Sequence, residues 1–413
     1  MDLRLENHPC FNDKARHTFG RVHLPVAPRC NIQCNFCNRK FDCVNESRPG
    51  VSSGILKPAQ AMAYLEEVFS QKKNISVVGI AGPGDPFANA DETLETMRLV
   101  REKYPDMMLC VASNGLNVLP YLDDIAALTV SHFTVTVNAV DPEIAAKIYS
   151  WVRFEKRVRG PREGAEILLG RQEETIRGLK ARGITTKVNT IVIPGVNDHH
   201  VEEVAKWVGA LGVDILNILP YYPNEGSNFA HLGEPPKAQI LELRNKAKQY
   251  VPLMHHCTRC RADAVGLLGE SMSDQLLNKL KECETMVPAE NTDRPYVAVA
   301  SGDGAFVNEH LGQARRLLIY GRKNGKVAFL EARSTPKPGV GNDRWDRLAD
   351  QLGDCRALLV SGIGNNPRTA LSRRGITITE TQGSVAEKVG AIYDVKEHPS
   401  GAPESTCSGP CSA

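Results

Sequence analysis

The sequence predicts an α/β protein, a partial (β/α)6 barrel of the TIM type followed by a small α/β domain. Strand-like and helix-like segments alternate six times between residues 22 and 250. Consecutive β-α units require parallel strands joined by right-handed crossovers, which predicts the barrel. A polar segment without apolar periodicity then separates the barrel from about a hundred residues of mixed α/β pattern, a length typical of an independent domain.

The six barrel strands are expected at short runs rich in apolar and β-branched residues. These runs are Val22–Ala27, Ile75–Ile80, Met107–Ala112, His132–Asn138, Thr185–Ile193 and Asp214–Leu219. The helices that alternate with them are expected over Pro58–Ser70, Asp91–Tyr104, Tyr121–Leu128, Arg171–Arg182, Val201–Leu211 and Ala238–Tyr250. Pro58 at a first helical position and Gly183 just after a helix are typical helix ends.

The second domain has its own set of predicted elements. Its strands are expected over Tyr296–Ala300, Leu317–Tyr320, Val327–Glu331, Ala357–Ser361 and Ile376–Ile378, and its helices over Arg344–Leu352 and Val385–Val389. The predicted organisation is therefore an N-terminal segment (1–20), a barrel with a C-x-x-C extension (21–282), a linker (283–293), the second domain (294–395) and a Ser/Gly/Pro-rich tail (396–413) expected to be disordered.

Composition excludes several classes of protein. The 413 residues are 42% hydrophobic and 24% charged with a net charge of +2, which argues against a nucleic-acid surface. No apolar run is long enough to span a membrane and the first residues do not resemble a signal peptide, so we expect a cytoplasmic protein that does not contact membranes. Twelve cysteines in such a chain indicate metal binding or catalysis more than disulfides.

Three of these cysteines form a tight loop after the first predicted strand. Cys30, Cys34 and Cys37 place three thiolates within eight residues. A 4Fe–4S cluster held by only three cysteines keeps one iron open for an outside ligand. The alternative is a closed zinc site with Cys43 as fourth ligand. The order C-x-x-x-C-x-φ-C, with Phe36 before the last cysteine, resembles the loop of radical S-adenosylmethionine (SAM) enzymes.

In a parallel barrel the functional residues lie at the carboxyl ends of the strands. The second predicted strand ends there in Gly82-Pro83-Gly84-Asp85. Glycines let the backbone approach a ligand closely. A plain turn is the alternative, but at this position the segment resembles the one that binds the methionyl amino group of SAM.

Polar side chains on the later barrel strands also point to a ligand. The period of two puts Thr134, Thr136 and Asn138 on one face of the fourth strand, and Lys187 and Asn189 on one face of the next. A barrel strand has helices outside and a lumen inside, so neither face should be solvated. The polar face is therefore predicted to line a ligand site.

Two charged residues follow the cysteine loop closely enough to reach the same cavity. Glu46 would contribute a carboxylate and Arg48 a guanidinium, and a surface ion pair is the alternative. Beyond the last barrel helix, Cys257 and Cys260 form a C-x-x-C motif that could be redox-active, zinc-binding or cluster-binding. His255, beside it, is expected to be exposed, as is His256.

The combination of these motifs resembles the NifB family, the radical-SAM enzymes of nitrogenase cofactor biosynthesis. The matching motifs, in order, are His8-Pro9-Cys10, the Cys30/Cys34/Cys37 loop with Asn38-Arg39 and Asp42-Cys43, Glu46-Ser47-Arg48-Pro49-Gly50, Ala81–Pro86, Thr134-x-Thr136-x-Asn138 and Cys257-x-x-Cys260-Arg261-Ala262-Asp263. The second domain resembles NifX/NafY-type cofactor-carrier domains with an RNase H-like fold. Its Val307–Gly312 segment is similar to their histidine motif, with Leu311 where an aromatic residue is expected.

The resemblance implies a site and an activity. The catalytic residues would be Cys30, Cys34, Cys37, Glu46 and Arg48, and the SAM-binding residues Phe36, Gly82, Gly84, Asp85, Thr134, Thr136, Asn138 and Asn189. Two substrate 4Fe–4S clusters would be held by Cys10, His23 and Cys110 and by Cys43, Cys257 and Cys260, and His310 would carry the product. A core histidine is the alternative for His23, and a small buried hydrophobe for Cys110.

The implied reaction fuses the two substrate clusters. One SAM would methylate a substrate cluster, and a second would give a 5′-deoxyadenosyl radical that takes hydrogen from the methyl group. A carbide and a ninth sulfur would then complete an 8Fe–9S–C product called NifB-co. The expected cofactors are three 4Fe–4S clusters, one of them SAM-binding, and SAM itself.

The resemblance also implies partners, and it leaves two other functions open. The partners are cofactor-maturation scaffold and carrier proteins of the nitrogenase system, an iron–sulfur cluster donor, and a reducing ferredoxin or flavodoxin. One alternative is a radical-SAM enzyme whose auxiliary clusters serve a peptide or small molecule. The other is a non-catalytic iron–sulfur scaffold or carrier, which would produce no deoxyadenosine.

Overall fold

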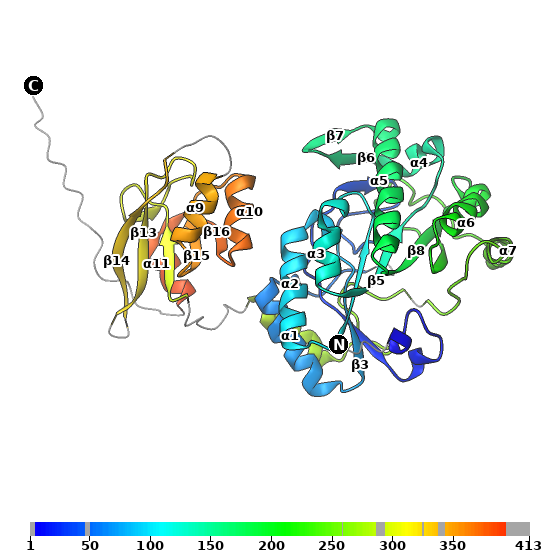
Figure 1. The fold of residues 1–413 in the computed structure, drawn as a ribbon, viewed down its shortest axis with the longest axis horizontal. Coiled ribbons are helices and arrows are strands. Elements are labelled where there is room, and N and C mark those ends of the chain that lie inside the picture. The colour runs from blue at the N-terminus through cyan, green and yellow to red at the C-terminus, as the bar shows by residue number, and fades with distance from the viewer. Residues whose placement is uncertain are drawn as a thin grey trace, which may run out of the picture. The chain divides into compact units, whose positions relative to one another are not determined.

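The computed structural model describes residues 5–45, 50–257, 259–285, 294–323, 326–337 and 343–393. The chain forms two compact units, Met1–Met286 and Val287–Ala413 (Figure 1). Among the described residues, no helix combines the length and the apolar character needed to cross a membrane. Glu46, Arg48, residues 286–293 of the expected linker and the expected tail lie outside the described residues.

The first unit is built on a seven-stranded sheet in the order β10-β1-β3-β4-β5-β8-β9. All neighbouring pairs are parallel except β10 with β1. The strands are β1 (Gly20–His23), β3 (Ile75–Ile80), β4 (Met108–Ser113), β5 (Val130–Thr136), β8 (Thr185–Val192), β9 (Ile215–Pro220) and β10 (Val265–Gly266). The predicted partial (β/α)6 barrel is confirmed, because six parallel strands occur in chain order.

Helices alternate with these strands (Figure 1). They are α1 (Pro58–Gln71), α2 (Ala90–Lys103), α3 (Leu122–Ala127), α4 (Pro142–Ile148), α5 (Pro161–Ala181), α6 (Val201–Ala210), α7 (Lys237–Ala247) and α8 (Asp274–Thr285). The predicted linker began at residue 283, which was wrong, because α8 continues to Thr285. Leu276, Leu280 and Cys283 recur on one face of α8 and are buried in the barrel's main apolar cluster.

The first strand ends earlier than predicted, at His23 instead of Ala27. Pro25 has no N–H to continue the strand. The following residues form a loop at the barrel mouth, where the Leu24 N–H donates to Gly79 O and the Ala27 N–H to Gly82 O. This loop leads directly into the cysteine segment.

A second small sheet went unpredicted. It is antiparallel, in the order β2-β6-β7, with β2 (Ile32–Cys34), β6 (Tyr149–Phe154) and β7 (Arg157–Arg159). Its first strand lies inside the cysteine loop, and Cys34 pairs with Tyr149. The loop between Cys30 and Cys37 is therefore held by strand pairing with a hairpin more than a hundred residues later in the chain.

Both faces of the central strand β5 are buried, as the barrel predicts. Phe133 and Val135 are fully buried toward the helices, while Thr134 and Thr136 are 1% and 3% exposed on the opposite face. The polar residues of β5 therefore face the lumen and not solvent.

The second unit is a five-stranded mixed sheet in the order β14-β13-β11-β15-β16. The strands are β11 (Tyr296–Val299), β13 (Arg316–Lys323), β14 (Lys326–Ser334), β15 (Cys355–Val360) and β16 (Thr377–Glu380), with a small β12 (Phe306–Val307) and β17 (Gly383–Ser384) pair. The helices are α9 (Asp343–Gln351), α10 (Asn365–Arg373) and α11 (Val385–Ile392). The first three strands of the sheet are antiparallel and the last two are parallel to β11, the arrangement of an RNase H-like fold.

Candidate metal centre

The cysteine loop borders a cavity at the mouth of the barrel, which we call the loop cavity. Its main polar lining comes from the loop, from the end of β3 and from the ends of β4 and β5. The lining includes Cys30, Cys34, Cys37, Arg39, Cys43, Asn45, Gly84, Asp85, Ala112, Ser113, Asn114 and Thr136. The structure thus brings the three predicted cluster ligands together beside the predicted glycine-rich turn.

Gly84 explains how the turn and the loop come so close. Its N–H donates to Ala27 O at 2.6 Å, and the next N–H, of Asp85, donates to Arg29 O at 2.8 Å. A Cβ atom at Gly84 would lie 2.1 Å from Arg29 O. Only glycine fits this contact, so the turn fixes the position of the residue immediately before Cys30.

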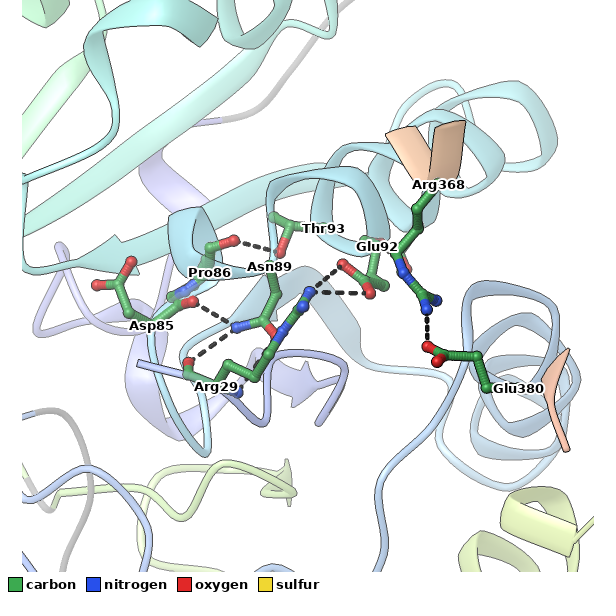
Figure 2. Close-up of polar contacts among 9 residues, drawn as sticks. Arg29, Asp85, Pro86, Asn89, Glu92, Thr93, Arg368 and Glu380 are labelled. Atoms are coloured by element: carbon green, nitrogen blue, oxygen red, sulfur yellow. Dashed lines mark hydrogen bonds and ion pairs between the residues drawn. The ribbon is translucent and has the colours of Figure 1, made fainter. Parts of the chain in front are cut away.

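Asn89 completes this junction (Figure 2). Its side-chain amide donates to Arg29 O and to Asp85 O, both at 2.8 Å, and its oxygen accepts from Arg29 Nε at 3.0 Å. The Arg29 guanidinium continues to Glu92 at 3.2 Å. The start of the cysteine loop is therefore tied to α2 through a network that the sequence motifs did not reveal.

The Asp85 carboxylate stabilises the fold beneath the loop cavity. It accepts hydrogen bonds from the N–H groups of Phe87 (2.9 Å) and Asn114 (2.7 Å) and from Ser113 Oγ (3.0 Å). Burial raises its pKa above the usual range, against the opposing effect of these bonds. Asp85 thereby joins the ends of β3 and β4 under the loop cavity.

The loop thiols would need a bound cationic centre to act as ligands. Burial raises the pKa of Cys30 to about 12 and raises the pKa of Cys34 well above its usual value. Deprotonated ligands here require a bound cationic centre, which an iron–sulfur cluster provides.

A second cavity, the inner cavity, lies deeper in the barrel. It shares Ala112 with the loop cavity, so the two adjoin. Five further candidate ligands line it, together with Phe11, Gly79, Thr134, Lys187 and Asn189; the five are Cys10, His23, Cys110, Cys257 and Cys260. They come from the N-terminal segment, β1, β4 and the C-x-x-C extension, which are far apart in sequence.

His23 is oriented as a ligand. Its Nδ1 lies 3.0 Å from Arg261 O, and because a carbonyl only accepts, Nδ1 carries the proton and Nε2 keeps its lone pair. Burial lowers its pKa to about 4, so the ring is neutral at physiological pH. Gly79 makes room for the ring, since a Cβ there would lie 2.9 Å from His23 Cδ2.

The N-terminal segment is fixed across the barrel by two histidines. His8 Nδ1 accepts the Cys10 N–H at 3.1 Å, and His256 Nε2 donates to Pro9 O at 3.1 Å. The expectation that His256 is exposed was wrong, because its side chain is only 8% exposed and contacts Asp13 at 3.4 Å. Burial raises the pKa of Cys10 to about 12.

Lys187 lines the inner cavity, and His8 and His132 pack against Phe11, which lines it too. Lys187 is 8% exposed, with Nζ 5.6 Å from the Phe11 ring centroid. The His8 and His132 rings lie 4.2 Å apart, and burial lowers the pKa of His132 to about 3. His132 continues the period-two face of Thr134 and Thr136, so the sequence did contain a signal for it.

Several predicted site residues lie elsewhere. Cys43 lines the loop cavity and does not join Cys257 and Cys260 in the inner one, because the backbone N–H of Cys43 is bound to Pro83 O at the β3 turn. Phe36 is fully buried in an apolar cluster and is not part of the cavity lining. Gly82 (φ +146°) forms the turn without lining either cavity.

The polar face of β5 does not serve one ligand as predicted. Thr136 lines the loop cavity and Thr134 the inner cavity. Asn138 lies beyond the strand, where its amide donates to Asn45 Oδ1 at 3.1 Å and its oxygen accepts the Ile191 N–H at 2.9 Å. Asn189 lines the inner cavity and donates to Asn45 O at 3.1 Å.

His310 lies in the second unit on an exposed turn. Its Nδ1 accepts the Gly312 N–H at 3.0 Å, which places the proton of the neutral ring on Nε2. Its ring covers Gly362, where a Cβ would lie 2.8 Å from His310 Cδ2. Leu311, at the position expected to be aromatic, is fully buried in the domain core.

Comparison with known proteins adds family matches for both units. Residues 24–208 match the radical SAM superfamily and residues 294–394 match the family described as dinitrogenase iron-molybdenum cofactor. The chain is 51% identical over 395 residues to the FeMo cofactor biosynthesis protein NifB of Chlorobaculum tepidum, covering 95% of this chain and 93% of that one. The corresponding proteins of Klebsiella pneumoniae and Azotobacter vinelandii are 40% and 36% identical, covering 89% and 94% of this chain and 86% and 88% of theirs.

Proposed function

The chain belongs to the family of FeMo cofactor biosynthesis proteins NifB, and from that premise we propose that it fuses two 4Fe–4S clusters into the 8Fe–9S–C precursor NifB-co, with insertion of a SAM-derived carbide and an extra sulfur. It is a radical SAM enzyme and therefore uses a 4Fe–4S cluster and SAM. The single observation that carries the proposal of cluster fusion is the pair of adjoining cavities. The three-cysteine loop lines one, and five more candidate ligands line the other.

In this proposal Cys30, Cys34 and Cys37 hold the SAM cluster at the loop cavity. When bound, that cluster supplies the electron for reductive cleavage of SAM. The close packing of Gly84 on Arg29 holds the turn against the loop, so that backbone groups around Gly84 and the hydroxyl of Thr136 bound the space for SAM. The buried lumen face of β5 would limit the access of bulk solvent to the same space.

The inner cavity would receive the substrate clusters. Cys10, His23, Cys110, Cys257 and Cys260 are the proposed ligands, and Cys43 lies on the loop-cavity side, where a substrate cluster could approach SAM. Substrate clusters bound by thiolates are anionic, and the cationic Lys187 in the wall favours their binding in a buried place. The neutral donor His23 would release iron more readily than a thiolate does when the clusters fuse.

The second unit would hold the product or pass it on. The match of residues 294–394 to the family described as dinitrogenase iron-molybdenum cofactor supports this role. Scaffold and carrier proteins of the nitrogenase system would then be the recipients, with an iron–sulfur cluster donor and a reducing ferredoxin or flavodoxin as the other partners. Deletion of Val287–Ala413 should leave SAM cleavage intact and reduce the amount of product that stays bound.

Iron analysis of anaerobically reconstituted protein tests the proposal. Three clusters predict about twelve irons per chain, and a Cys30→Ala/Cys34→Ala/Cys37→Ala variant should keep about eight. The wild type should release 5′-deoxyadenosine from SAM and form an 8Fe–9S–C product. About four irons per chain, or a peptide or small-molecule product, would contradict it, and absence of deoxyadenosine would favour a scaffold.

A further inference from the structure

Arg21 holds one of the proposed cluster ligands with two hydrogen bonds. Its Nε lies 3.2 Å and its Nη2 3.0 Å from Cys260 Sγ, so the two parallel N–H groups of the guanidinium converge on one sulfur. At Cys257 the nearby guanidinium is a different one, that of Arg244, which acts on the thiol through its charge. The two thiols of the C-x-x-C motif therefore differ in their surroundings.

The geometry of Arg21 is fixed by the rest of its contacts. The side chain is only 2% exposed, and its remaining nitrogen, Nη1, donates to Leu267 O at 2.8 Å and to Gly266 O. Both carbonyls belong to the turn at β10, which pairs with β1 at Arg21 itself. Burying a guanidinium is costly without such partners, so the fold positions this charge at Cys260.

Cys260 can bind a cluster and Arg21 at the same time. Cys260 lines the inner cavity and also an outer cavity of about 270 Å³. Arg21 lines the outer cavity and is not among the residues that line the inner one. Cys260 therefore borders the space proposed for a substrate cluster while its sulfur contacts the guanidinium.

We propose that Arg21 is a positioning residue that makes Cys260 the ligand from which a substrate cluster departs. The inference rests on the proposed function, in which Cys260 holds that cluster. Hydrogen bonds to a ligand sulfur withdraw electron density and raise the reduction potential of the bound cluster. The same withdrawal weakens the iron–sulfur bond at Cys260 relative to the one at Cys257.

The release step needs no further reagent at this residue. The Fe–Sγ bond breaks, both electrons remain on sulfur, and the iron is taken over by a ligand of the second cluster. The guanidinium of Arg21 is already in place to stabilise the thiolate left behind. No proton has to reach the sulfur during cluster transfer.

Redox titration of reconstituted protein followed by EPR tests the inference. Arg21→Met should lower the midpoint potential of one cluster, changing its oxidised-to-reduced ratio at a fixed potential at least tenfold, which is about 59 mV for a one-electron couple. Arg21→Lys keeps the charge but loses the paired donors and should give a smaller shift in the same direction. Resonance Raman should show a stiffer Fe–S(Cys) stretch in both variants.

Arg101→Lys is the matched control. The Arg101 guanidinium also donates to backbone carbonyls, at Met107 (2.8 Å) and Leu128 (3.0 Å), and within the described part of the chain its hydrogen-bond acceptors are all carbonyls. It should lower stability without moving any potential. If Arg21→Met does not fold, the smaller shift in Arg21→Lys remains the test.

A Cys260→Ala variant tests the role of Arg21 separately from the proposed function of Cys260 as a cluster ligand. Loss of iron in Cys260→Ala together with unchanged potentials in the Arg21 variants would overturn the role of Arg21 and leave the proposed function standing. Full iron content in Cys260→Ala would instead show that Cys260 is not a ligand, and both proposals for this thiol would fail.

Discussion

His23 in the barrel and His310 in the second unit are both proposed to bind iron, and both lie over a glycine that makes room for the ring. They differ in the group that faces Nδ1. In His23 it is a carbonyl, Arg261 O at 3.0 Å, and in His310 it is an N–H, that of Gly312 at 3.0 Å. The carbonyl beside His23 leaves Nε2 unprotonated, with a lone pair available for iron. The N–H beside His310 leaves Nε2 carrying the proton.

The comparison shows that a histidine in a motif is not yet a ligand. A metal-binding imidazole normally donates its second ring N–H to a carbonyl or carboxylate, which fixes the tautomer. The buried His23 already has this arrangement, whereas the exposed His310 must first break its bond to Gly312 and turn its ring. We therefore expect permanent binding at His23 and transient binding at His310.

The largest effect is expected for His23→Ala. SAM binding and cleavage should persist, because the loop cavity is untouched, but one substrate cluster should become labile and product yield should fall more than tenfold, about 1.4 kcal/mol or more of lost stabilisation. His23→Cys should restore iron content and only part of the activity, because thiolate holds iron more firmly. Iron content, deoxyadenosine and product are measured on the same samples.

Pulsed EPR of the wild type without SAM checks the assignment directly. A cluster held by His23 should show coupling to a ring nitrogen, and the coupling should disappear in His23→Ala. Persistence of the coupling would place the imidazole ligand elsewhere, and His8 would then be the next candidate.

The next largest effect is expected in the acid stability of the two units, which should differ. Burial lowers the pKa of His8 well below its usual value, that of His23 to about 4 and that of His132 to about 3. At these histidines the unfolded chain binds more protons than the folded one below about pH 6.5, so their contribution to stability is lost as pH falls through that range, by up to about 1.4 kcal/mol per pH unit for each fully buried histidine. The described part of the second unit has one histidine, the exposed His310.

Calorimetry of cluster-free protein between pH 7 and pH 5 measures this difference. The barrel transition should move to lower temperature more than the transition of the second unit. Replacing the buried His132 by Phe should reduce the pH dependence of the barrel. A parallel decrease of both transitions would show that burial of these histidines does not control acid stability.

The sequence was sufficient for the barrel and for its lumen. Six strand positions were recognisable because each is a short apolar run between turn residues, and β3 was predicted to its exact ends. The alternation in β5 also predicted that Thr134 and Thr136 face inward, since neither face of a barrel strand is solvated. Local periodicity determines both features.

What could not be predicted depends on contacts between distant segments. The pairing of Cys34 with Tyr149 and the contact of Arg21 with Cys260 leave no local pattern in either partner. The placement of Cys43 in the lining of the loop cavity has the same origin, because a backbone bond to Pro83 holds it beside the cysteine loop. The sequence therefore indicates candidate ligands, but their distribution between the cavities depends on contacts between distant segments.

A pair of glycine substitutions compares the surroundings of the His23 and His310 rings, and we expect moderate losses of stability. In Gly79→Ala the new Cβ would lie 2.9 Å from His23 Cδ2 inside the packed barrel, so we expect a loss of about 1–3 kcal/mol and a displaced ring with a labile cluster. In the matched Gly362→Ala the exposed His310 ring can swing away, and the cost should stay below about 1 kcal/mol. Urea unfolding and iron content measure both; equal costs would mean that the surroundings of the two rings do not differ in rigidity.

The smallest effect is expected for His310→Ala. SAM cleavage and iron content of the barrel should remain at wild-type levels, because His310 belongs to the other unit and its ring accepts a hydrogen bond from a neighbouring N–H. Product retention should fall by no more than a few fold, since the protein must spend energy to break the Gly312 bond before Nε2 can bind iron. The amount of product that co-purifies with the chain, and the rate at which it passes to a nitrogenase maturation protein, are the measurements. A loss as large as that in His23→Ala would show that His310 ligates iron permanently and that the Gly312 hydrogen bond is absent in the loaded protein.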